Sequence, residues 1–239
     1  MFRPDAVDDR RSPQRTGTAG WAGSPVPTAR FAGRPPRGAA RLVKRGIDIL
    51  GALLFFAFFG PLYVALALCV WTGGGHPVHY TQTRLGRGGR PFRFYKFRSM
   101  VLDADRVLER HLAGDPAARA EWDTYQKLEN DPRVLPVGRM LRRFSLDELP
   151  QFWNVLRGDM SLVGPRPCME RQRGLYGDAW SHYAAVRPGL TGLWQVSRRN
   201  ELSFAQRAEL DIAYVENWSL RLDFSILLRT VRAVIVDGE

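Results

Sequence analysis

Hydrophobic residues are unevenly distributed along the chain, and the longest uninterrupted run covers residues 49–71. This segment, ILGALLFFAFFGPLYVALALCVW, contains no charged side chain. As one straight helix it would be ~35 Å long, which is enough to cross a bilayer core of ~30 Å. The run therefore predicts a membrane helix rather than a core helix of a soluble protein.

Gly60 and Pro61 stand at the centre of this run. Proline removes a backbone hydrogen bond and clashes with the preceding turn, so we expect a break or a sharp bend between two arms, residues 49–59 and 62–71. Each arm reaches about the depth of one leaflet. Both flanks are rich in Arg and Lys, which favour the cytoplasmic side. A re-entrant hairpin satisfies both flanks, but a kinked spanning helix also fits, because membrane helices tolerate proline.

Downstream of this run the pattern changes to the alternation that is typical of strands. The stretches VHYTQTR and RPFRFYKFRSM are joined by the glycine-rich LGRGG, which predicts a β-hairpin. Alternate side chains of a strand share a face. One face of the second strand should therefore carry Phe92, Phe94, Lys96 and Arg98. Apolar residues at helical spacing predict further helices over 101–112, 116–129, 203–216 and 220–236.

These elements define an α+β fold that is mainly helical, has one small β-hairpin and is anchored to a membrane. Residues 1–40 are rich in Pro, Gly, Ala and Arg without apolar periodicity, so we expect a disordered basic tail. Residues 41–75 would form the membrane hairpin, and residues 76–239 a domain at the cytoplasmic face. The last predicted helix, 220–236, fits either an amphipathic helix at the membrane interface or a helix that faces the core.

The chain is strongly basic, with a formal charge of +11 and a pI near 10.4. This charge predicts an anionic partner, but nucleic acid, lipid headgroups and phosphorylated small molecules satisfy it equally. No helix-turn-helix, zinc-finger or aromatic RNP-like stretch is present, so we do not expect nucleic acid to be the partner.

The stretch SLDELPQ, residues 145–151, places Asp147 and Glu148 side by side in a basic region. In a capping box, Ser145 would cap a helix and Glu148 would bond back to its backbone. Pro150 would then lie inside the helix, although proline is better accommodated as a first helical residue. With a helix that starts at Pro150, the two carboxylates stand just ahead of its N-terminus.

Two adjacent carboxylates of this kind suit phosphoryl transfer. Carboxylates are ionised near neutral pH, so an aspartate can attack phosphorus without a partner base. Two acids that face a diphosphate need positive charge close by, and magnesium held by one or two carboxylates plus substrate phosphates is usual. The candidate cations of the chain are Lys96, Arg98, Arg142, Arg143, Arg157 and Arg166.

Five long blocks occur in order: KRGIDILGA, GRGGRPFRFYKFRSM, RRFSLDELPQFWNVLRGDMSLVGPRP, VRPGLTGLWQV and LDIAYVENWSLRLDFSILLRTV. Over roughly residues 41–236 the chain resembles the bacterial sugar transferases, or monotopic phosphoglycosyl transferases, in their compact form. The resemblance implies transfer of a sugar 1-phosphate from a UDP-sugar to undecaprenyl phosphate. UMP is released, and a glycan such as an exopolysaccharide is started on its lipid carrier.

The resemblance also implies roles for single residues. Asp147 matches the nucleophile that forms a covalent phosphosugar intermediate, and Glu148 matches the residue that binds Mg²⁺. The positions that contact phosphate or order the site match Lys96, Arg98, Arg142, Pro165, Arg166, Arg199 and Asp211. A re-entrant helix matches residues 47–71, at the cytoplasmic face of the cell membrane. Homodimerisation, the sugar and the glycan pathway stay open.

Two departures from the family pattern stand out. Gly60 replaces the serine that commonly precedes the helix-breaking proline, and Arg198 replaces a glycine in SRRN, which affects the turn that carries Arg199.

The alternative function is a membrane-tethered basic module that binds anionic lipid or nucleic acid. In that case SLDELPQ would serve only to start a helix.

Overall fold

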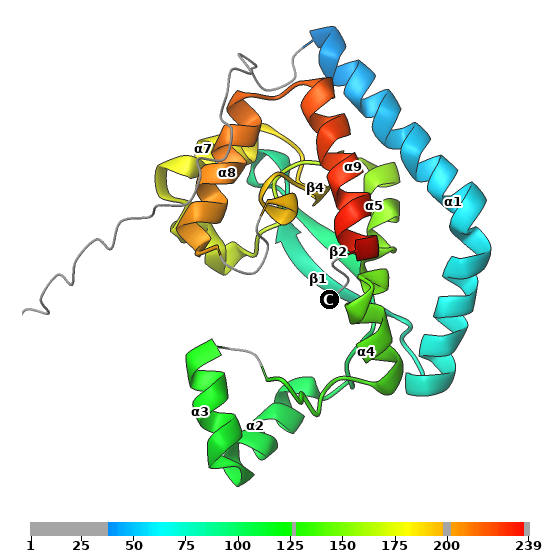
Figure 1. Cartoon of the computed structure of the whole chain (residues 1–239), viewed down its shortest axis with the longest axis vertical. Coiled ribbons are helices and arrows are strands. Elements are labelled where there is room, and N and C mark those ends of the chain that lie inside the picture. Colours follow the sequence, from blue (N-terminus) through cyan, green and yellow to red (C-terminus); the bar gives the residue numbers. More distant parts are fainter. Residues whose placement is uncertain (1–37, 126–127, 198–201, 237–239) are drawn as a thin grey trace, which may run out of the picture.

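The computed structural model describes residues 38–125, 128–197 and 202–236. The long helix α1 (Gly38–Gly74) comes first and is followed by the strands β1 (His79–Leu85) and β2 (Pro91–Phe97). Shorter helices and turns surround the strands, and α1 runs along one side of this body (Figure 1). The described part is mostly helical, as the sequence predicts.

Helix α1 is not broken at the expected position. Helical structure continues from Gly38 to Gly74 with Pro61 inside it, and the ribbon bends near its middle (Figure 1). A proline disrupts only its own turn, so the flanking hydrogen bonds can carry a helix through a bend. By length and composition α1 could also cross a bilayer.

The β-hairpin is confirmed. Strands β1 and β2 pair antiparallel from His79 opposite Phe97 to Leu85 opposite Pro91. The turn between them contains Gly88 and Gly89, both at a φ of 70°. Such left-handed backbone is easiest for glycine, which explains the GRGG sequence.

The predicted helices are also present, with ends shifted by a few residues. They are α2 (Ala104–Gly114), α3 (Pro116–Tyr125), α8 (Phe204–Glu216) and α9 (Leu220–Val236). Helices α2 and α3 pack on each other around Leu112 and Ala118 and project from the rest of the body (Figure 1). The remaining helices are α4 (Pro136–Arg143), α5 (Gln151–Arg157), α6 (Arg173–Tyr176) and α7 (Trp180–Ala185).

A second small sheet was not predicted. Strands β3 (Ser161–Val163) and β4 (Gly189–Thr191) pair in parallel. All three residues of β3 are buried, so this strand lacks the alternation that marks a half-exposed strand in a sequence. Its neighbours in the main core include Val155 of α5, Tyr214 of α8 and Ile226 of α9.

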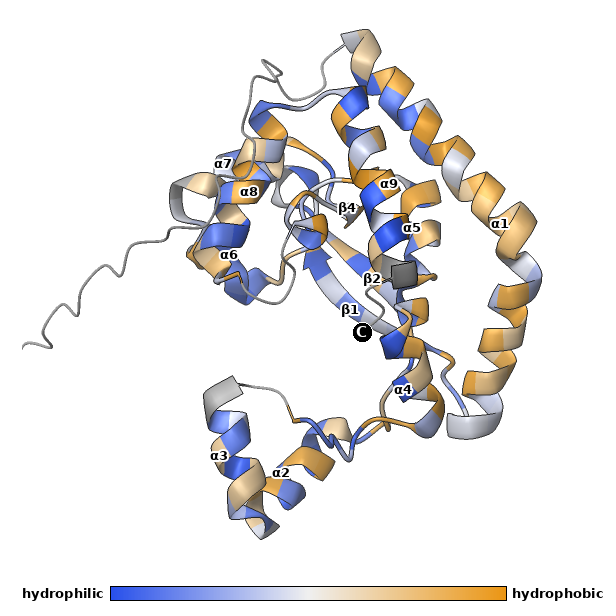
Figure 2. Cartoon of the chain, in the orientation of Figure 1, coloured by the Kyte–Doolittle hydropathy of each residue, from blue (hydrophilic) through white to orange (hydrophobic). Residues whose placement is uncertain are grey.

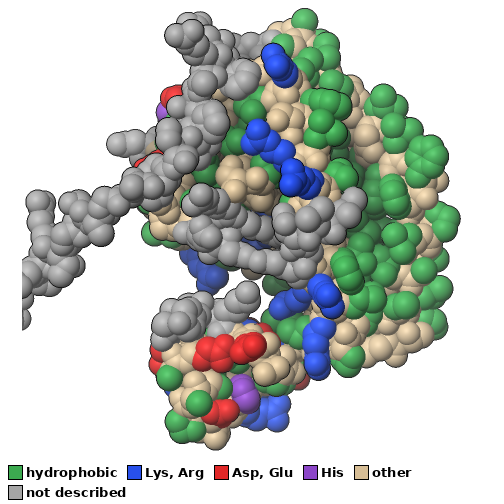
Figure 3. Space-filling view, viewed as in Figure 1, with side chains coloured by type: hydrophobic (Ala, Val, Ile, Leu, Met, Phe, Trp, Pro, Cys, Tyr) green, Lys and Arg blue, Asp and Glu red, His purple; other side chains and the backbone are tan. Residues whose placement is uncertain are grey.

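Helix α1 packs on the body along one edge only. Ala52 joins the main core, and Leu66 and Val70 pack with Phe97 and Leu141. The rest of the helix is apolar and exposed, with Phe58 75% exposed. Figure 2 shows the hydrophobic residues along α1, and Figure 3 shows them covering that side of the surface. An apolar face this large is typical of a membrane contact.

Candidate active site

The acidic pair lies in the short passage between α4 and α5. A 3₁₀ turn, Leu146–Glu148, carries both carboxylates, and α5 begins at Gln151 with Pro150 at its cap position. Ser145 is left-handed, with a φ of 53°, and its side chain makes no capping hydrogen bond. The capping-box interpretation is therefore wrong, whereas the expected helix start at Pro150 lies within one residue of the observed one.

One lysine bridges the two carboxylates. Lys96 of β2 donates from Nζ to Asp147 Oδ2 at 3.0 Å and to Glu148 Oε1 at 2.9 Å. Arg166, which follows β3, donates from Nη2 to the same oxygen of Glu148 at 3.1 Å. Asp147 is only 7% exposed, so the ammonium group of Lys96 covers a largely buried carboxylate.

Asn154 holds the strand that supplies this lysine. It lies on α5, is fully buried, accepts from the backbone N–H of Tyr95 at 3.1 Å and donates to the carbonyl oxygen of Arg93 at 2.6 Å. The amide thus fixes β2 against α5, and the helix that follows the acidic pair also positions Lys96. Periodicity could not reveal this residue, because a buried asparagine has no pattern of its own.

Arg98, which follows β2, and Arg142 of α4 contact the segments next to the acidic pair's lysine strand, and neither has a described bond to the acidic pair. Arg98 comes one residue after the strand and donates from Nη2 to the carbonyl oxygens of Gly74 and Gly75, the latter at 2.7 Å. It therefore caps the C-terminal end of α1. Arg142 donates from Nε to Ser99 Oγ at 2.9 Å.

The remaining predicted residues lie in different places. The carbonyl oxygen of Pro165 accepts from the N–H of Gly189 at 2.8 Å, which ties the loop of Arg166 to β4. Asp211 of α8 is buried and accepts from the hydroxyl of Tyr176 at 3.0 Å. Burial raises the pKa of Asp211 to about 7. Arg199, with its neighbour Arg198, lies outside the described residues.

Two further candidate cations have other contacts. Arg157 lies at the far end of α5 and pairs with Asp159 at 3.3 Å. The guanidinium of Arg143 lies 5.5 Å from the ring centre of Phe144. Of the cations considered from the sequence, Lys96 and Arg166 are the ones with described bonds to the acidic pair.

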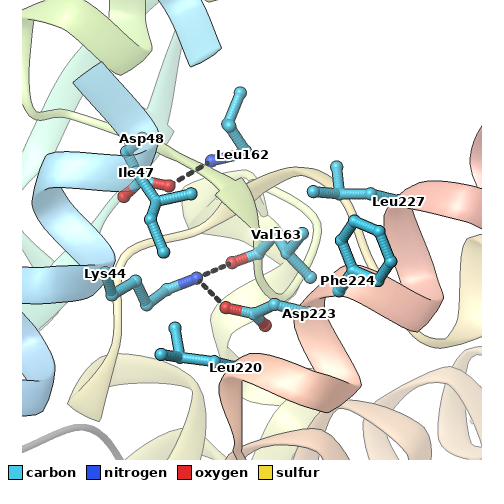
Figure 4. Close-up of a pocket in the computed structure, with 9 residues that line it drawn as sticks. All are labelled: Lys44, Ile47, Asp48, Leu162, Val163, Leu220, Asp223, Phe224 and Leu227. Atoms are coloured by element: carbon cyan, nitrogen blue, oxygen red, sulfur yellow. Dashed lines mark hydrogen bonds and ion pairs between the residues drawn. The ribbon is translucent and has the colours of Figure 1, made fainter. Parts of the chain in front are cut away.

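A second polar cluster joins α1 to the body (Figure 4). Lys44 of α1 donates from Nζ to Asp223 Oδ2 of α9 at 2.6 Å and to the carbonyl oxygen of Val163 at 3.1 Å. One turn later, Asp48 Oδ1 accepts from Ser161 Oγ at 2.9 Å and from the N–H of Leu162 at 3.0 Å. Lys44 and Asp48 thus each bond to a residue of β3, and Lys44 also bonds to α9.

This cluster has a consequence for the acidic pair. Strand β3 leads through Gly164 and Pro165 into Arg166, so α1 and α9 together hold the strand from which that arginine emerges. The sequence analysis missed this connection. Its visible signal is the spacing of Lys44 and Asp48 by one helical turn, just ahead of the uncharged run.

The residues present fit a magnesium ion only in part. No group of three or more His, Cys, Asp or Glu side chains gathers within the described ranges. The two adjacent carboxylates already converge on one cationic group, the ammonium of Lys96. They can supply one or two ligands, and phosphate oxygens and water would have to complete the coordination, as is usual for magnesium.

Comparison with known proteins places this site in a family. The family model for bacterial sugar transferases matches residues 39–237. A UDP-galactose-lipid carrier transferase of Erwinia amylovora is 48% identical over 197 residues, which are 82% of this chain and 41% of that protein. The undecaprenyl-phosphate galactose phosphotransferase of Salmonella typhimurium is 47% identical over the same shares. The chain therefore spans less than half the length of these two relatives.

A third relative is closer in size. The exopolysaccharide production protein ExoY of Rhizobium meliloti is 45% identical over 209 residues, which cover 87% of this chain and 91% of that protein. The family-model match, residues 39–237, includes the acidic pair and the elements that hold it. The chain belongs to the bacterial sugar transferase family.

Proposed function

We propose that this protein transfers a sugar 1-phosphate from a UDP-sugar to undecaprenyl phosphate, and that Asp147 carries the phosphosugar between them. The observation that supports this most is the meeting of Asp147, Glu148, Lys96 and Arg166 at one point. The names of the relatives, which include undecaprenyl-phosphate sugar phosphotransferases, support the same substrates.

The chemistry proceeds in two displacements. A carboxylate oxygen of Asp147 attacks the phosphorus that bears the sugar, the bond from that phosphorus to the bridging oxygen breaks, and UMP leaves. An oxygen of undecaprenyl phosphate then attacks the same phosphorus, and the bond to Asp147 breaks to restore the carboxylate. Each step exchanges one P–O bond for another.

The cations of the site serve both steps. Lys96 and Arg166 can bind the phosphate oxygens of the donor and stabilise the charge that develops on them. Because Lys96 bonds to Asp147, a donor phosphate that attracts the ammonium also uncovers the nucleophile. Glu148 would hold a magnesium ion, which supplies further positive charge to the diphosphate when it is bound.

The packing of α1 supports a re-entrant arrangement. Near its start, α1 bonds to β3 and α9 through Lys44 and Asp48, and at its end the carbonyl oxygen of Gly74 accepts from Arg98. Both ends thus contact the same polar body, whereas a spanning helix would separate them by a core of ~30 Å. The cationic flanks favour the cytoplasmic face.

Asp147→Asn tests the mechanism, because an amide is a poor nucleophile. We expect no UMP release from a panel of UDP-sugars with undecaprenyl phosphate and magnesium. Intact-mass spectrometry without the acceptor should show a sugar-phosphate adduct on the wild type and none on the variant. Asp123→Asn, at an exposed side chain of α3, is the matched control. Full UMP release by the Asp147 variant would refute the mechanism.

A further inference from the structure

A polar cavity of about 440 Å³ lies away from the acidic pair. It is lined by the hairpin turn, by the residues just after α5, and by residues at the end of α7 and just after it. Asp147 precedes α5, whereas this cavity lies at the opposite end of the helix. Its lining includes Arg87, Arg90, Gly158, Asp159 and Arg187.

The lining carries more positive than negative charge. Three of its residues are arginines and one is an aspartate. Asp159 Oδ2 already lies 3.3 Å from Nε of Arg157 and accepts from Nδ2 of Asn154 at 3.3 Å. Its charge is therefore shared with groups outside the arginine cluster.

A fourth arginine approaches the same wall from α1. A Cβ placed on Gly158 would lie 3.4 Å from Nη2 of Arg45 and 3.9 Å from Nη2 of Arg187. Gly158 has a φ of 84°, and both this conformation and the nearby guanidinium groups disfavour a side chain there. The glycine therefore lets two guanidinium groups converge at the wall of the cavity.

These two arginines donate to backbone carbonyls and to no described carboxylate. Arg45 donates to the carbonyl oxygens of Val155 and Leu156 at 2.6 and 2.8 Å, and Arg187 donates to that of Gly158 at 2.7 Å. Capping the C-terminal end of α5 explains where they lie. It does not balance their charge, because a helix end carries only about half a unit of negative charge.

Like charges also crowd one another here. Burial and the nearby charges of Arg45 and Arg41 lower the pKa of Arg187, and Asp48 and Asp159 oppose this only in part. An anion in the cavity would relieve the repulsion. A cavity lined by several arginines suits phosphate, because guanidinium groups bind phosphate in a planar, bidentate geometry.

We propose that this cavity is a second anion site, which binds the phosphate group of a lipid headgroup or of a soluble phosphate ester. Arg87, Arg90 and Arg187 supply the contacts. The cavity is partly open, which would admit a small soluble anion. Arg45 stands four residues before the uncharged run that begins at Ile49, so a lipid headgroup is the other candidate source of the phosphate. The proposal does not depend on the chemistry at Asp147.

Isothermal titration calorimetry on the full-length protein in detergent tests the site. The probes are inorganic phosphate, glycerol 1-phosphate and short-chain phosphatidylglycerol, with short-chain phosphatidylcholine for comparison. We expect saturable binding of at least one anionic probe. Arg87→Gln combined with Arg90→Gln should weaken it by about tenfold, which is typical for the loss of a hydrogen bond to a charged group. These turn residues have no described backbone contacts through their side chains, so the variant should fold.

Two matched variants separate this site from others. Arg110→Gln combined with Arg171→Gln removes the same two charges at exposed positions and should leave binding unchanged. Arg166→Met at the acidic pair should leave unchanged the binding that the Arg87 and Arg90 substitutions weaken. Preference for phosphatidylglycerol identifies a headgroup, and equal binding of glycerol 1-phosphate identifies a soluble ester. The proposal is overturned if no anion binds, if binding survives the double substitution, or if only Arg166→Met abolishes it.

Discussion

At the scale of single residues, the ammonium of Lys96 is the group that links the two carboxylates of the acidic pair. It bonds to both carboxylates, and Arg166 adds a second cation to Glu148 alone. Asp147 therefore depends on Lys96 for its described ionic contact, whereas Glu148 has two. This asymmetry agrees with the proposed roles. Asp147 must give up its ion pair with Lys96 to form a bond to phosphorus, whereas Glu148 keeps positive charge nearby.

Lys96→Met tests that role, because methionine keeps much of the apolar stem and removes the charge. We expect UMP release to fall at least tenfold, since charge-assisted contacts to the donor phosphates are lost. Lys96→Arg should restore part of the activity. Initial rates of UMP release over a range of donor concentrations measure both effects, and unchanged rates in the methionine variant would contradict them.

Asp211 predicts a pH dependence of stability. Its pKa rises from an ordinary 3.8 to about 7 on burial, so between these values the folded protein keeps a proton that the unfolded chain has released. The free energy of unfolding therefore falls as the pH rises through this window. Asp211→Asn cannot ionise and should flatten this part of the profile and raise the melting temperature above pH 7.

Thermal melts of the wild type and of Asp211→Asn from pH 4 to pH 8 check this expectation. The hydrogen bond from Tyr176 can be kept, because the asparagine carbonyl also accepts. Glu170→Gln at an exposed side chain controls for the loss of one acid. Parallel profiles for the wild type and the Asp211 variant would show that burial does not raise this pKa.

At the scale of elements, helix α1 is attached to the body by ionic as well as apolar contacts. The ring of Phe55 stacks on that of Phe152 of α5, with centroids 3.8 Å apart, and Lys44 forms a largely buried pair with Asp223. The same aspartate accepts from the hydroxyl of Tyr214 and from the indole N–H of Trp218. Helices α1 and α9 are thus parts of one packed unit.

Lys44→Met should destabilise the fold, because it leaves Asp223 as a largely buried charge without its cation. Removing one partner of a buried pair typically costs about 3 kcal/mol or more. Combining Lys44→Met with Asp223→Asn should recover part of that loss. Denaturant unfolding in detergent measures the free energies, and Arg119→Met, from an exposed pair with Asp123, should have little effect. An equal loss in the double variant would contradict the charge explanation.

Elements with a repeating pattern could be predicted from the sequence, and elements held by isolated contacts could not. The hairpin and helices α8 and α9 have clear periodicity, and the structure confirms them. Strand β3 has three buried residues and no alternation, so it was missed. The sequence left α9 as either an interfacial helix or a core-facing one, and the structure shows that it has both a buried and an exposed side: Ile226 is buried in the core, whereas Phe224 is 63% exposed.

Within the site, the sequence predicted which cations could accompany the acidic pair, but it did not predict which residues each of them contacts. Lys96 and Arg166 were among the candidate cations and do reach the acidic pair. Arg98 was expected on the same face as Lys96, but strand alternation ends at Phe97 and its guanidinium turns to α1. Contacts between distant segments, such as those of Asn154 with β2, leave no trace in local spacing.

At the scale of the whole molecule, the exposed side of α1 is the surface best suited to meet a membrane. The apolar side chains of α1 form one face (Figure 3), and Leu146, which directly precedes the acidic pair, packs with Val70 of α1 and Phe97 of β2. A site next to the bilayer suits an acceptor whose phosphate lies at the surface and whose chain stays in the lipid.

Thiol labelling tests the orientation of α1. In a Cys69→Ser background, Arg41→Cys and Thr72→Cys place exposed thiols near the two ends of the helix. A re-entrant helix predicts that a membrane-impermeant reagent labels neither position in intact cells and both in inverted vesicles. Labelling of one end from each side would show that α1 spans. Cys168 is buried and should react only after denaturation.

The lysine that bridges the two acids has one more consequence, for side reactions. With its oxygen held under an ammonium group, Asp147 should be a poor target for carboxyl-modifying reagents and for other electrophiles. The same group is drawn away by the diphosphate of an arriving donor. Binding of the donor would then free the carboxylate of Asp147 in the same step, and Lys96 would protect that carboxylate from modification until a donor binds.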